Sequence, residues 1–322
     1  MRATIRFISI CIAALLAAQT ISCDRAPASG ELTVHTPSTS ATEQLPSPPV
    51  SSSEGGEQVL LENLHVGEDA LGQWIERARE YELPAACPSV TAIAIPHHLT
   101  AGYLISGALD MLKQTQETYD SVIIVAPNHQ GDLADIVYSR ADWEVFGGTV
   151  ECDAELSAAI LDGGINTASI RQSDARLEED HSCSALIPFI AHYMPDARVA
   201  PVLVSRTISL ENTLVLTHAI YEAAANSGKR VLLLCSIDFS HYLTATEAYK
   251  MDEQTLDAIN TRNLMSIHEM SNHYMDSPAT LNVFLQYLSL SGLRDTHVLD
   301  HTDASEFLGA VAETTTYFVL CG

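Results

Sequence analysis

Three segments of this chain are apolar at nearly every position and rich in β-branched residues, which is the pattern of strands that are buried on both faces. They are Val90–Ile95, Ser121–Ala126 and Val231–Cys235. A strand without polar alternation needs helices on both sides of its sheet. The pattern therefore predicts an α/β fold with three layers, α/β/α, around a central sheet that is mostly parallel or mixed.

Helical patterns alternate with strand patterns from residue 68 to the C-terminus. The main helices are expected at 102–115, 182–193, 210–225, 244–259 and 278–290. A further helix is expected to begin after Asp153, which is a suitable N-cap. Apolar residues make up 47% of the 322 residues, which excludes global disorder. With no internal repeat and no linker-like break, we expect one domain at 60–322.

The first 22 residues have the pattern of an export signal. A basic start precedes an apolar stretch at 7–18 that is too short to span a bilayer as a helix. The sequence Thr-Ile-Ser-Cys that ends at Cys23 resembles a bacterial lipobox, which predicts lipidation of Cys23; an ordinary signal peptide cleaved nearby is the alternative. Residues 23–59, rich in Pro, Ser and Thr, predict a flexible tether. We therefore expect an exported lipoprotein, anchored to a membrane of the bacterial cell envelope.

The charge balance of the chain is strongly acidic. It has 16 basic and 41 acidic residues, for a formal net charge of −25 at pH 7. Binding to nucleic acid needs clustered Lys and Arg, so a nucleic-acid partner is excluded. The same charge is compatible with simple solubility or with a salt-rich habitat.

Five cysteines follow Cys23, at wide spacings and without a CxxC motif. They are Cys87, Cys152, Cys183, Cys235 and Cys321. This spacing excludes a small disulfide-rich scaffold. One or two disulfides in an oxidising compartment and buried free thiols are both compatible with it.

Residues that suit metal chemistry occur in four short segments. The segments are Pro96-His97-His98, Asn128-His129, Asp180-His181-Ser182 and Asp238-Phe239-Ser240-His241. In an α/β sheet, the residues that follow the carboxyl ends of the strands form the crevice where ligands bind. Several imidazoles and carboxylates in one crevice would suit a divalent metal ion, because neutral imidazole is a common metal ligand.

Two of these segments leave their chemistry open. Asp238 is suited to accept the ring N–H of His241, or to poise His241 as a general acid or base; capping of the next helix is the alternative. The acids at 178–180 predict a raised pKa for His181, which suits a proton shuttle or a substrate-binding group. Helix capping by Asp180 is the simpler role.

Several familiar motifs do not occur in the sequence. There is no GxGxxG, no Walker loop, no HExxH and no GxSxG. Dinucleotide binding, phosphoryl transfer and serine hydrolysis therefore lose support.

Taken together, the motifs resemble the Memo family, also called AmmeMemoRadiSam system protein B, from about residue 90 to the C-terminus. The segments that carry the resemblance are Ile95-Pro96-His97 with Ala101-Gly102-Tyr103, Ala126-Pro127-Asn128-His129, Asp180-His181-Ser182 and Ser236-Ile237-Asp238-Phe239-Ser240-His241-Tyr242. The resemblance implies a fold like that of class III extradiol dioxygenases, which use non-haem iron. It also suggests a functional link to a radical SAM protein and an AMMECR-type protein.

The resemblance implies that His97 and His129 are metal ligands, with His241 close to the metal and His181 near the same cleft. This sequence departs from the family pattern in three places. His98 and two further residues interrupt the family's Pro-His-Ala-Gly-Tyr, so either His97 or His98 is the ligand. Tyr274 stands where the family has a ligand cysteine, so His273, one position away, is a candidate replacement, as is Tyr274 itself. An Asp, at 180, replaces the family's usual Glu.

Three hypotheses about function follow. In the first, the protein is a redox enzyme in which His97, His129 and one of His241 or His273 hold iron, or else copper or zinc, while His181 and Asp238 manage protons. In the second, the cleft binds a metal, a peptide or a small ligand without turnover. In the third, the metal activates water for hydrolysis. The sequence does not identify the substrate.

Overall fold

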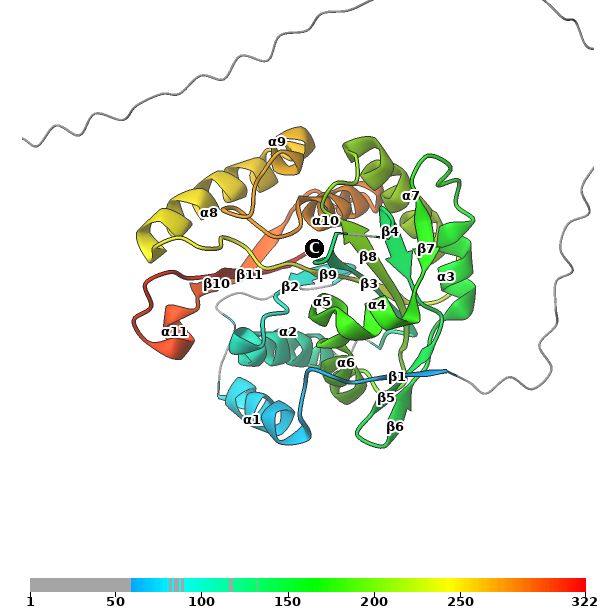
Figure 1. Cartoon of the computed structure of the whole chain (residues 1–322), viewed down its shortest axis with the longest axis horizontal. Coiled ribbons are helices and arrows are strands. Elements are labelled where there is room, and N and C mark those ends of the chain that lie inside the picture. The colour runs from blue at the N-terminus through cyan, green and yellow to red at the C-terminus, as the bar shows by residue number, and fades with distance from the viewer. Residues whose placement is uncertain (1–58, 81–82, 84–86, 88–89, 116–117, 132) are drawn as a thin grey trace, which may run out of the picture. The chain divides into compact units, whose positions relative to one another are not determined.

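An eight-stranded sheet lies at the centre of the part of the chain described by the structure, a computed structural model (Figure 1). The structure describes residues 59–322 except 81–82, 84–86, 88–89, 116–117 and 132. The predicted signal peptide, Cys23 and the tether up to residue 58 lie outside the described residues. Within the described residues, no helix has both the length and the apolar character needed to cross a bilayer.

The central sheet is mixed, and its strand order is β10-β11-β2-β9-β3-β8-β4-β7. Its strands are β2 (Ala92–Ile95), β3 (Ser121–Asn128), β4 (Ile136–Tyr138), β7 (Ile170–Gln172), β8 (Arg198–Ser205), β9 (Val231–Ser236), β10 (His297–Asp303) and β11 (Thr316–Cys321). The four middle strands β2, β9, β3 and β8 are parallel to one another, whereas β11 and β10 continue the sheet in antiparallel fashion. A small second sheet consists of β1 (Leu60–Glu62), β5 (Asp142–Val145) and β6 (Gly148–Val150).

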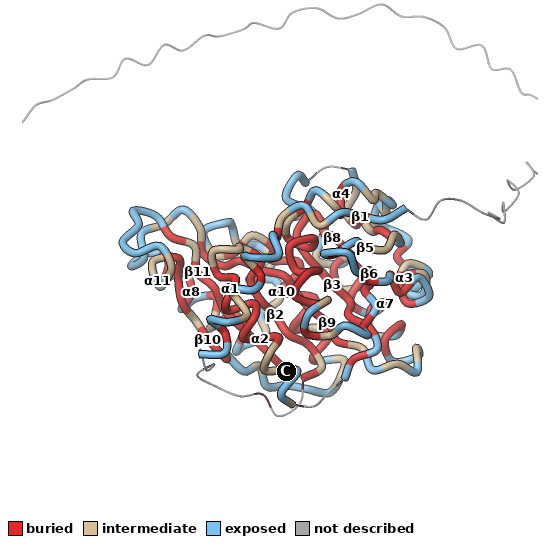
Figure 2. The backbone as a smooth tube through the Cα atoms, turned by 90° about the horizontal axis from the view of Figure 1, so that it is seen from below, coloured by how far each residue is buried: buried red, intermediate tan, exposed pale blue. Residues whose placement is uncertain are grey.

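Both faces of the central sheet are buried. Ile93 and Ile95 of β2 belong to one hydrophobic core, and Ala92 and Ala94 of the same strand belong to another. The same alternation occurs along β3 and β9, because successive side chains of a strand point to opposite faces. Figure 2 shows the buried backbone running through these strands. The predicted three-layer α/β/α class is therefore confirmed.

The helices divide between the two faces of the sheet. The first core is covered by α1 (Glu68–Arg79), α2 (Gly102–Gln114), α4 (Asp174–Glu179), α5 (His181–Ser184) and α6 (Ile187–Tyr193). The second core is covered by α3 (Ala154–Leu161), α7 (Leu210–Asn226), α8 (Ala245–Asn260), α9 (Leu264–His268) and α10 (Pro278–Leu290). Two short elements, η1 (Leu99–Ala101) and α11 (Ser305–Leu308), lie beside each other. As predicted, Asp153 caps α3 by accepting from the backbone N–H of Leu156.

The structure pairs two of the five cysteines whose state the sequence leaves open. Cys87 and Cys321, which are 234 residues apart, form a disulfide. Cys152, Cys183 and Cys235 are free and buried. The disulfide attaches the segment before β2 to the end of the last strand.

The parallel middle strands bring the predicted metal-binding segments to one edge of the sheet. Ile95 at the end of β2 pairs with Ser236 at the end of β9, and β3 lies on the other side of β9. The strand β3 runs two residues further than predicted, through Pro127 to Asn128, whose register partner is Ser205. His97, His129 and Asp238 therefore follow three neighbouring strands at the same edge.

Candidate metal centre

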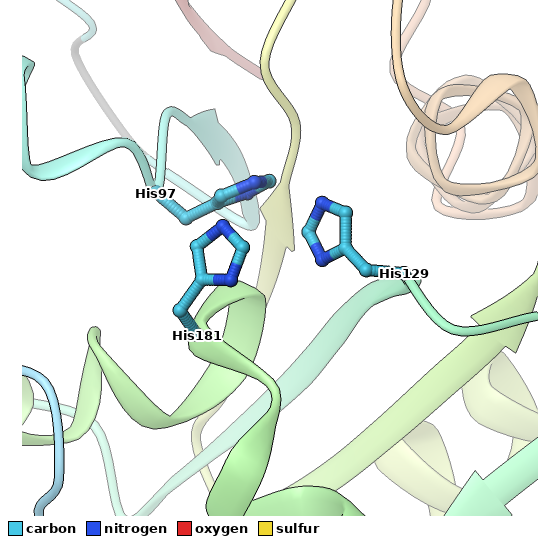
Figure 3. Close-up of side chains that lie close together, drawn as sticks. All are labelled: His97, His129 and His181. Atoms are coloured by element: carbon cyan, nitrogen blue, oxygen red, sulfur yellow. The ribbon is translucent and has the colours of Figure 1, made fainter.

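Three histidines from three different elements meet above this edge of the sheet. His97 follows β2, His129 follows β3, and His181 is the first residue of α5. One ligand nitrogen from each ring can be chosen so that all three lie within 4.8 Å of one another. Figure 3 shows the three rings turned toward a common point. This arrangement can hold one metal ion.

The hydrogen bonds of His97 leave one ring nitrogen available for a ligand. Its Nδ1 lies 2.8 Å from the hydroxyl of Ser236, and that hydroxyl donates to the carbonyl of Ser182 at 2.6 Å. Since the hydroxyl proton is used in this way, Ser236 accepts from Nδ1–H of His97, and Nε2 carries the lone pair. Burial lowers the pKa of His97 to about 3, so the ring is neutral, which is the form that binds metals.

His129 is oriented by a carboxylate. Its Nδ1 lies 2.8 Å from Oδ1 of Asp180, and its backbone N–H donates to Oδ2 of the same residue. Asp180 also caps α5 by accepting from the backbone N–H of Ser182, so the predicted capping role holds as well. Burial lowers the pKa of His129, but the hydrogen bond and charge of Asp180 outweigh it and raise that pKa. A carboxylate on Nδ1–H is the usual support of a histidine that binds metal through Nε2.

His181 differs from the other two histidines, and one prediction about it is wrong. Burial and the neighbouring His129 lower the pKa of His181, so the expected increase from the acids at 178–180 is not found. The nearest of these acids, Asp180, directs its carboxylate to His129 instead. Within the described part of the chain, no hydrogen bond holds either ring nitrogen of His181.

Two carboxylates form a second group with His97. Asp238 lies with Oδ2 3.4 Å from Nε2 of His97, while its Oδ1 accepts from the backbone N–H of the same residue at 3.2 Å. Asp276 lies with Oδ2 3.2 Å from Nε2 of His97 and 3.8 Å from Nε2 of His129. Burial and the charge of Asp238 raise the pKa of Asp276 well above its ordinary value. These separations are within the range that one ion could bridge.

A cavity of about 340 Å³ opens over these groups. Besides the residues above, it is lined by His98, His241, Tyr242, Asn272 and Thr315. None of its lining residues is Lys or Arg, so among them only the histidines could carry a positive charge opposite Asp238 and Asp276. This donor set of imidazoles and carboxylates suits iron, copper or zinc, and an ion there would offset the buried negative charge.

The structure separates the two adjacent histidines that the sequence could not distinguish. His97 turns its ring toward His129 and His181, at ring-centroid distances of 5.2 and 5.3 Å. His98 places Nδ1 2.7 Å from the hydroxyl of Tyr317 on β11. Of the two, His97 is therefore the residue of the cluster.

His241 lines the cavity but belongs to neither of the two candidate ligand groups found among the described residues. Its Nδ1 is buried without a hydrogen-bond partner in the described part of the chain, so the proposed bond to Asp238 is not formed. Burial lowers the pKa of His241, although the charge of Asp238 acts in the opposite direction. His241 thus lies close to the cluster as a neutral imidazole.

The two candidates for the missing cysteine lie outside the cluster. His273 is exposed and does not line the cavity. The hydroxyl of Tyr274 donates to the side chain of Gln254 on α8, at 3.0 Å. The residue of this loop that faces the histidines is Asp276, which sequence reasoning missed. Its available signal was an acid two residues before Pro278, in the loop where the resemblance expects a ligand.

Known proteins with similar sequences point to one family. A family model described as Memo-like protein matches residues 65–320. A MEMO1 family protein from Methanothermobacter thermautotrophicus is 30% identical over 203 residues, which are 59% of this chain and 70% of that protein. A MEMO1 family protein from Pyrobaculum aerophilum is 27% identical over 266 residues, covering 78% of this chain and 92% of that protein.

A solved structure supports the fold. The crystal structure of an uncharacterized protein from Escherichia coli K12 matches with a TM-score of 0.50 at 9% sequence identity. The match covers 73% of this chain and all of that chain. At this identity, the likeness concerns the fold alone.

Proposed function

Because this chain belongs to the Memo-like protein family, whose model matches residues 65–320, we propose that it is a metal-dependent redox enzyme. The metal would be iron or copper, held by His97 and His129 at the carboxyl ends of β2 and β3. The observation that carries this proposal is the convergence of His97, His129 and His181, with ligand nitrogens within 4.8 Å of one another.

The hydrogen bonds of the two proposed ligands support a metal site, because they involve Nδ1 of each ring and leave Nε2 available. Ser236 holds Nδ1 of His97, and Asp180 holds Nδ1 of His129, so both Nε2 atoms face the cavity with free lone pairs. This is the arrangement that orients histidines toward an ion. Without an ion, Nε2 of the buried His97 would face only the carboxylate oxygens of Asp238 and Asp276, at 3.4 and 3.2 Å.

The remaining groups of the cavity would exchange protons and support the metal ligands. A bound redox-active ion would supply the electron-transfer chemistry. His181 is partly exposed, and its ring has no hydrogen bond among the described residues, so it is placed to exchange a proton with a ligand in the cavity. Asp238 accepts from the backbone N–H of His97 and so holds the backbone from which that ring extends.

A non-catalytic role, in which the cavity binds a metal, a peptide or a small ligand, is the second candidate. One observation favours it: Tyr274 stands where the resemblance expects a ligand cysteine, and it bonds Gln254 rather than facing the cavity. The nature of the bound metal separates the two roles. Iron or copper favours redox chemistry, whereas zinc favours binding or hydrolysis.

Elemental analysis of the full-length protein, purified without chelators, tests the proposal. We expect near-stoichiometric iron or copper in the unmodified chain and loss of most of it in His129→Ala. His273→Ala is the matched control, because it removes an exposed histidine that does not line the cavity, and it should keep its metal. Full metal occupancy in His129→Ala would contradict the site.

We further propose that the protein is exported and attached to a membrane by a lipid on Cys23. The disulfide between Cys87 and Cys321 supports export, because disulfides persist in oxidising compartments and are rare in the cytosol. The lipobox-like sequence that ends at Cys23 supports the lipid anchor.

A further inference from the structure

We propose that Asp276 is the anionic ligand of this centre, so that one carboxylate and the two imidazoles of His97 and His129 hold the ion. This inference rests on the proposed metal-dependent function and specifies its ligand set. It places His181 next to the ion without making it a ligand. A site of two histidines and one carboxylate leaves several coordination positions open, and it is typical of non-haem Fe(II).

The distances of Asp276 fit a shared ion. Its Oδ2 lies 3.2 Å from Nε2 of His97 and 3.8 Å from Nε2 of His129. Ligand atoms at about 2.0–2.2 Å from a tetrahedral ion lie roughly 3.3–3.6 Å apart. Both separations are close to this range, so Oδ2 of Asp276 is near enough to the Nε2 atom of each histidine to share an ion with it.

The hydrogen bonds of Asp276 leave its carboxylate available. Oδ1 is buried and has no hydrogen-bond partner in the described part of the chain, and Oδ2 receives only a long contact of 3.4 Å from the backbone N–H of Asp238. A buried acceptor without a partner is unfavourable, and more so when it is charged. A cation at this place would remove that cost.

The charge of Arg206 favours the ionised form of Asp276, but the guanidinium makes no hydrogen bond to this carboxylate among the described residues. Arg206, just after β8, donates to backbone carbonyls of the loop: Met270 at 2.7 Å, Met275 at 3.1 Å and Asp276 itself at 2.5 Å. Arg206 therefore fixes the backbone of the loop, while the Asp276 side chain is directed to the histidines. These bonds hold the loop in the position from which the Asp276 carboxylate reaches the two histidines.

The other carboxylate and the third histidine are bound differently. Oδ1 of Asp238 already accepts from the backbone N–H groups of His97 and His98, so Asp238 supports the loop after β2. His181 has no partner on either ring nitrogen among the described residues, whereas His97 and His129 each have one. Histidines that bind metals nearly always donate their second N–H to such a partner. Asp276 is therefore the better third ligand.

Isothermal titration calorimetry of the metal-free full-length protein with Co²⁺ tests this assignment. Loss of a supporting carboxylate typically weakens metal binding by about 10–100-fold, so loss of a ligand should exceed about 100-fold. We expect Asp276→Asn to weaken Co²⁺ binding by more than about 100-fold. Asp238→Asn removes the same charge from the same cavity, and it should weaken Co²⁺ binding by no more than about 100-fold. His181→Asn should bind Co²⁺ nearly as tightly as the unmodified chain.

A second measurement separates ligation from a structural role. Metal-free Asp276→Asn should unfold at the same temperature as the metal-free unmodified chain or higher, because the substitution removes a buried acid without a partner. Added Co²⁺ should raise the unfolding temperature of the unmodified chain much more than that of Asp276→Asn.

The outcomes are distinguishable. If the unmodified chain binds no divalent metal, the proposed function fails and this assignment fails with it. If the unmodified chain binds Co²⁺ and Asp276→Asn binds it equally well, only the assignment of Asp276 is overturned. The same conclusion follows if His181→Asn loses as much affinity as Asp276→Asn, since His181 would then be the third ligand.

Discussion

Single hydrogen bonds decide what the histidines of this centre can do. His97 and His129 each donate Nδ1–H to an oxygen behind the ring, from Ser236 and Asp180 respectively, and this leaves Nε2 for a ligand. Asp180 does two things at once, because it also caps α5. One carboxylate thus joins the local structure of a helix to the orientation of a candidate ligand.

A residue far from the centre allows a test of the electrostatics. Asp153, buried at the N-terminus of α3, receives hydrogen bonds from Ser121 and Lys229. Burial raises its pKa, but the bonds to Lys229 and Ser121 outweigh this and lower it below 3.8. Its charged form therefore stabilises the fold above about pH 4, and this stabilisation is lost as the pH falls through the lowered pKa.

We predict that Asp153→Asn lowers the free energy of unfolding by about 1.5–3 kcal/mol at pH 7, the range for a hydrogen bond to a charged group. The difference from the unmodified chain should be smaller at pH 3, because Asp153 begins to be protonated as the pH falls toward its lowered pKa. Urea unfolding at the two pH values measures this. Glu155→Gln is the control, because Glu155 approaches the same Lys229 at 3.7 Å but is exposed, and it should change little. A pH-independent loss in Asp153→Asn would contradict the electrostatic explanation.

At the scale of elements, the centre depends on strands that end together and on one loop that is held in place. The parallel strands β2, β9 and β3 bring His97, Asp238 and His129 to one edge. The loop before α10 brings Asp276 to the same place, and Arg206 at the end of β8 holds that loop by its carbonyls.

We predict that Arg206→Met weakens metal binding as well as the fold. Loss of its hydrogen bonds should destabilise the protein by about 2 kcal/mol or more and should let Asp276 move away from the histidines. Arg262→Met is the matched control: Arg262 is also half-buried and donates to the carbonyls of Leu285 and Arg294, at 2.6 and 2.7 Å. Thermal unfolding and Co²⁺ titration of both variants measure the two effects.

Both arginine variants should be less stable, but only Arg206→Met should lose metal affinity. Equal affinities in the two variants would show that the loop keeps Asp276 in position without Arg206.

At the scale of the whole molecule, the disulfide and the N-terminal pattern point to the same compartment. Cys87 and Cys321 are joined across 234 residues of sequence, and a link over so long a loop restricts the unfolded chain considerably. Disulfides persist in oxidising compartments and are rare in the cytosol, so the bond agrees with the proposed export signal ahead of Cys23.

We predict that Cys23→Ser releases the protein from membranes without changing its fold, because the lipid would be the attachment. Membrane fractionation of cells that produce either protein measures this. Replacement of Cys152, a free and buried cysteine, by Ser is the control and should leave the protein in the membrane fraction. Unchanged fractionation of Cys23→Ser would rule out lipidation at that residue.

Much of the fold could be predicted from the sequence because its signals are local. Continuous apolar runs such as Val231–Cys235 identify strands buried on both faces, and these runs imply helices on either side. Chain order and strand ends also indicate that His97, His129 and Asp238 follow strands. The extension of β3 through Pro127 was missed, since a proline usually ends a central strand and only its neighbour β8 shows that this one continues.

The sequence by itself thus determined the α/β class, the strand-end histidines and the likeness to the Memo family. Only the tertiary structure decided that His97 rather than His98 joins the cluster, that His273 lies outside it and that Asp276 lies inside it. The physical reason is separation along the chain. Burial patterns can be recognised from neighbouring residues in the sequence, whereas the direction of a loop side chain depends on partners that are far away in the sequence. Tyr317 draws His98 away from the centre, and Arg206 places the loop of Asp276 against it.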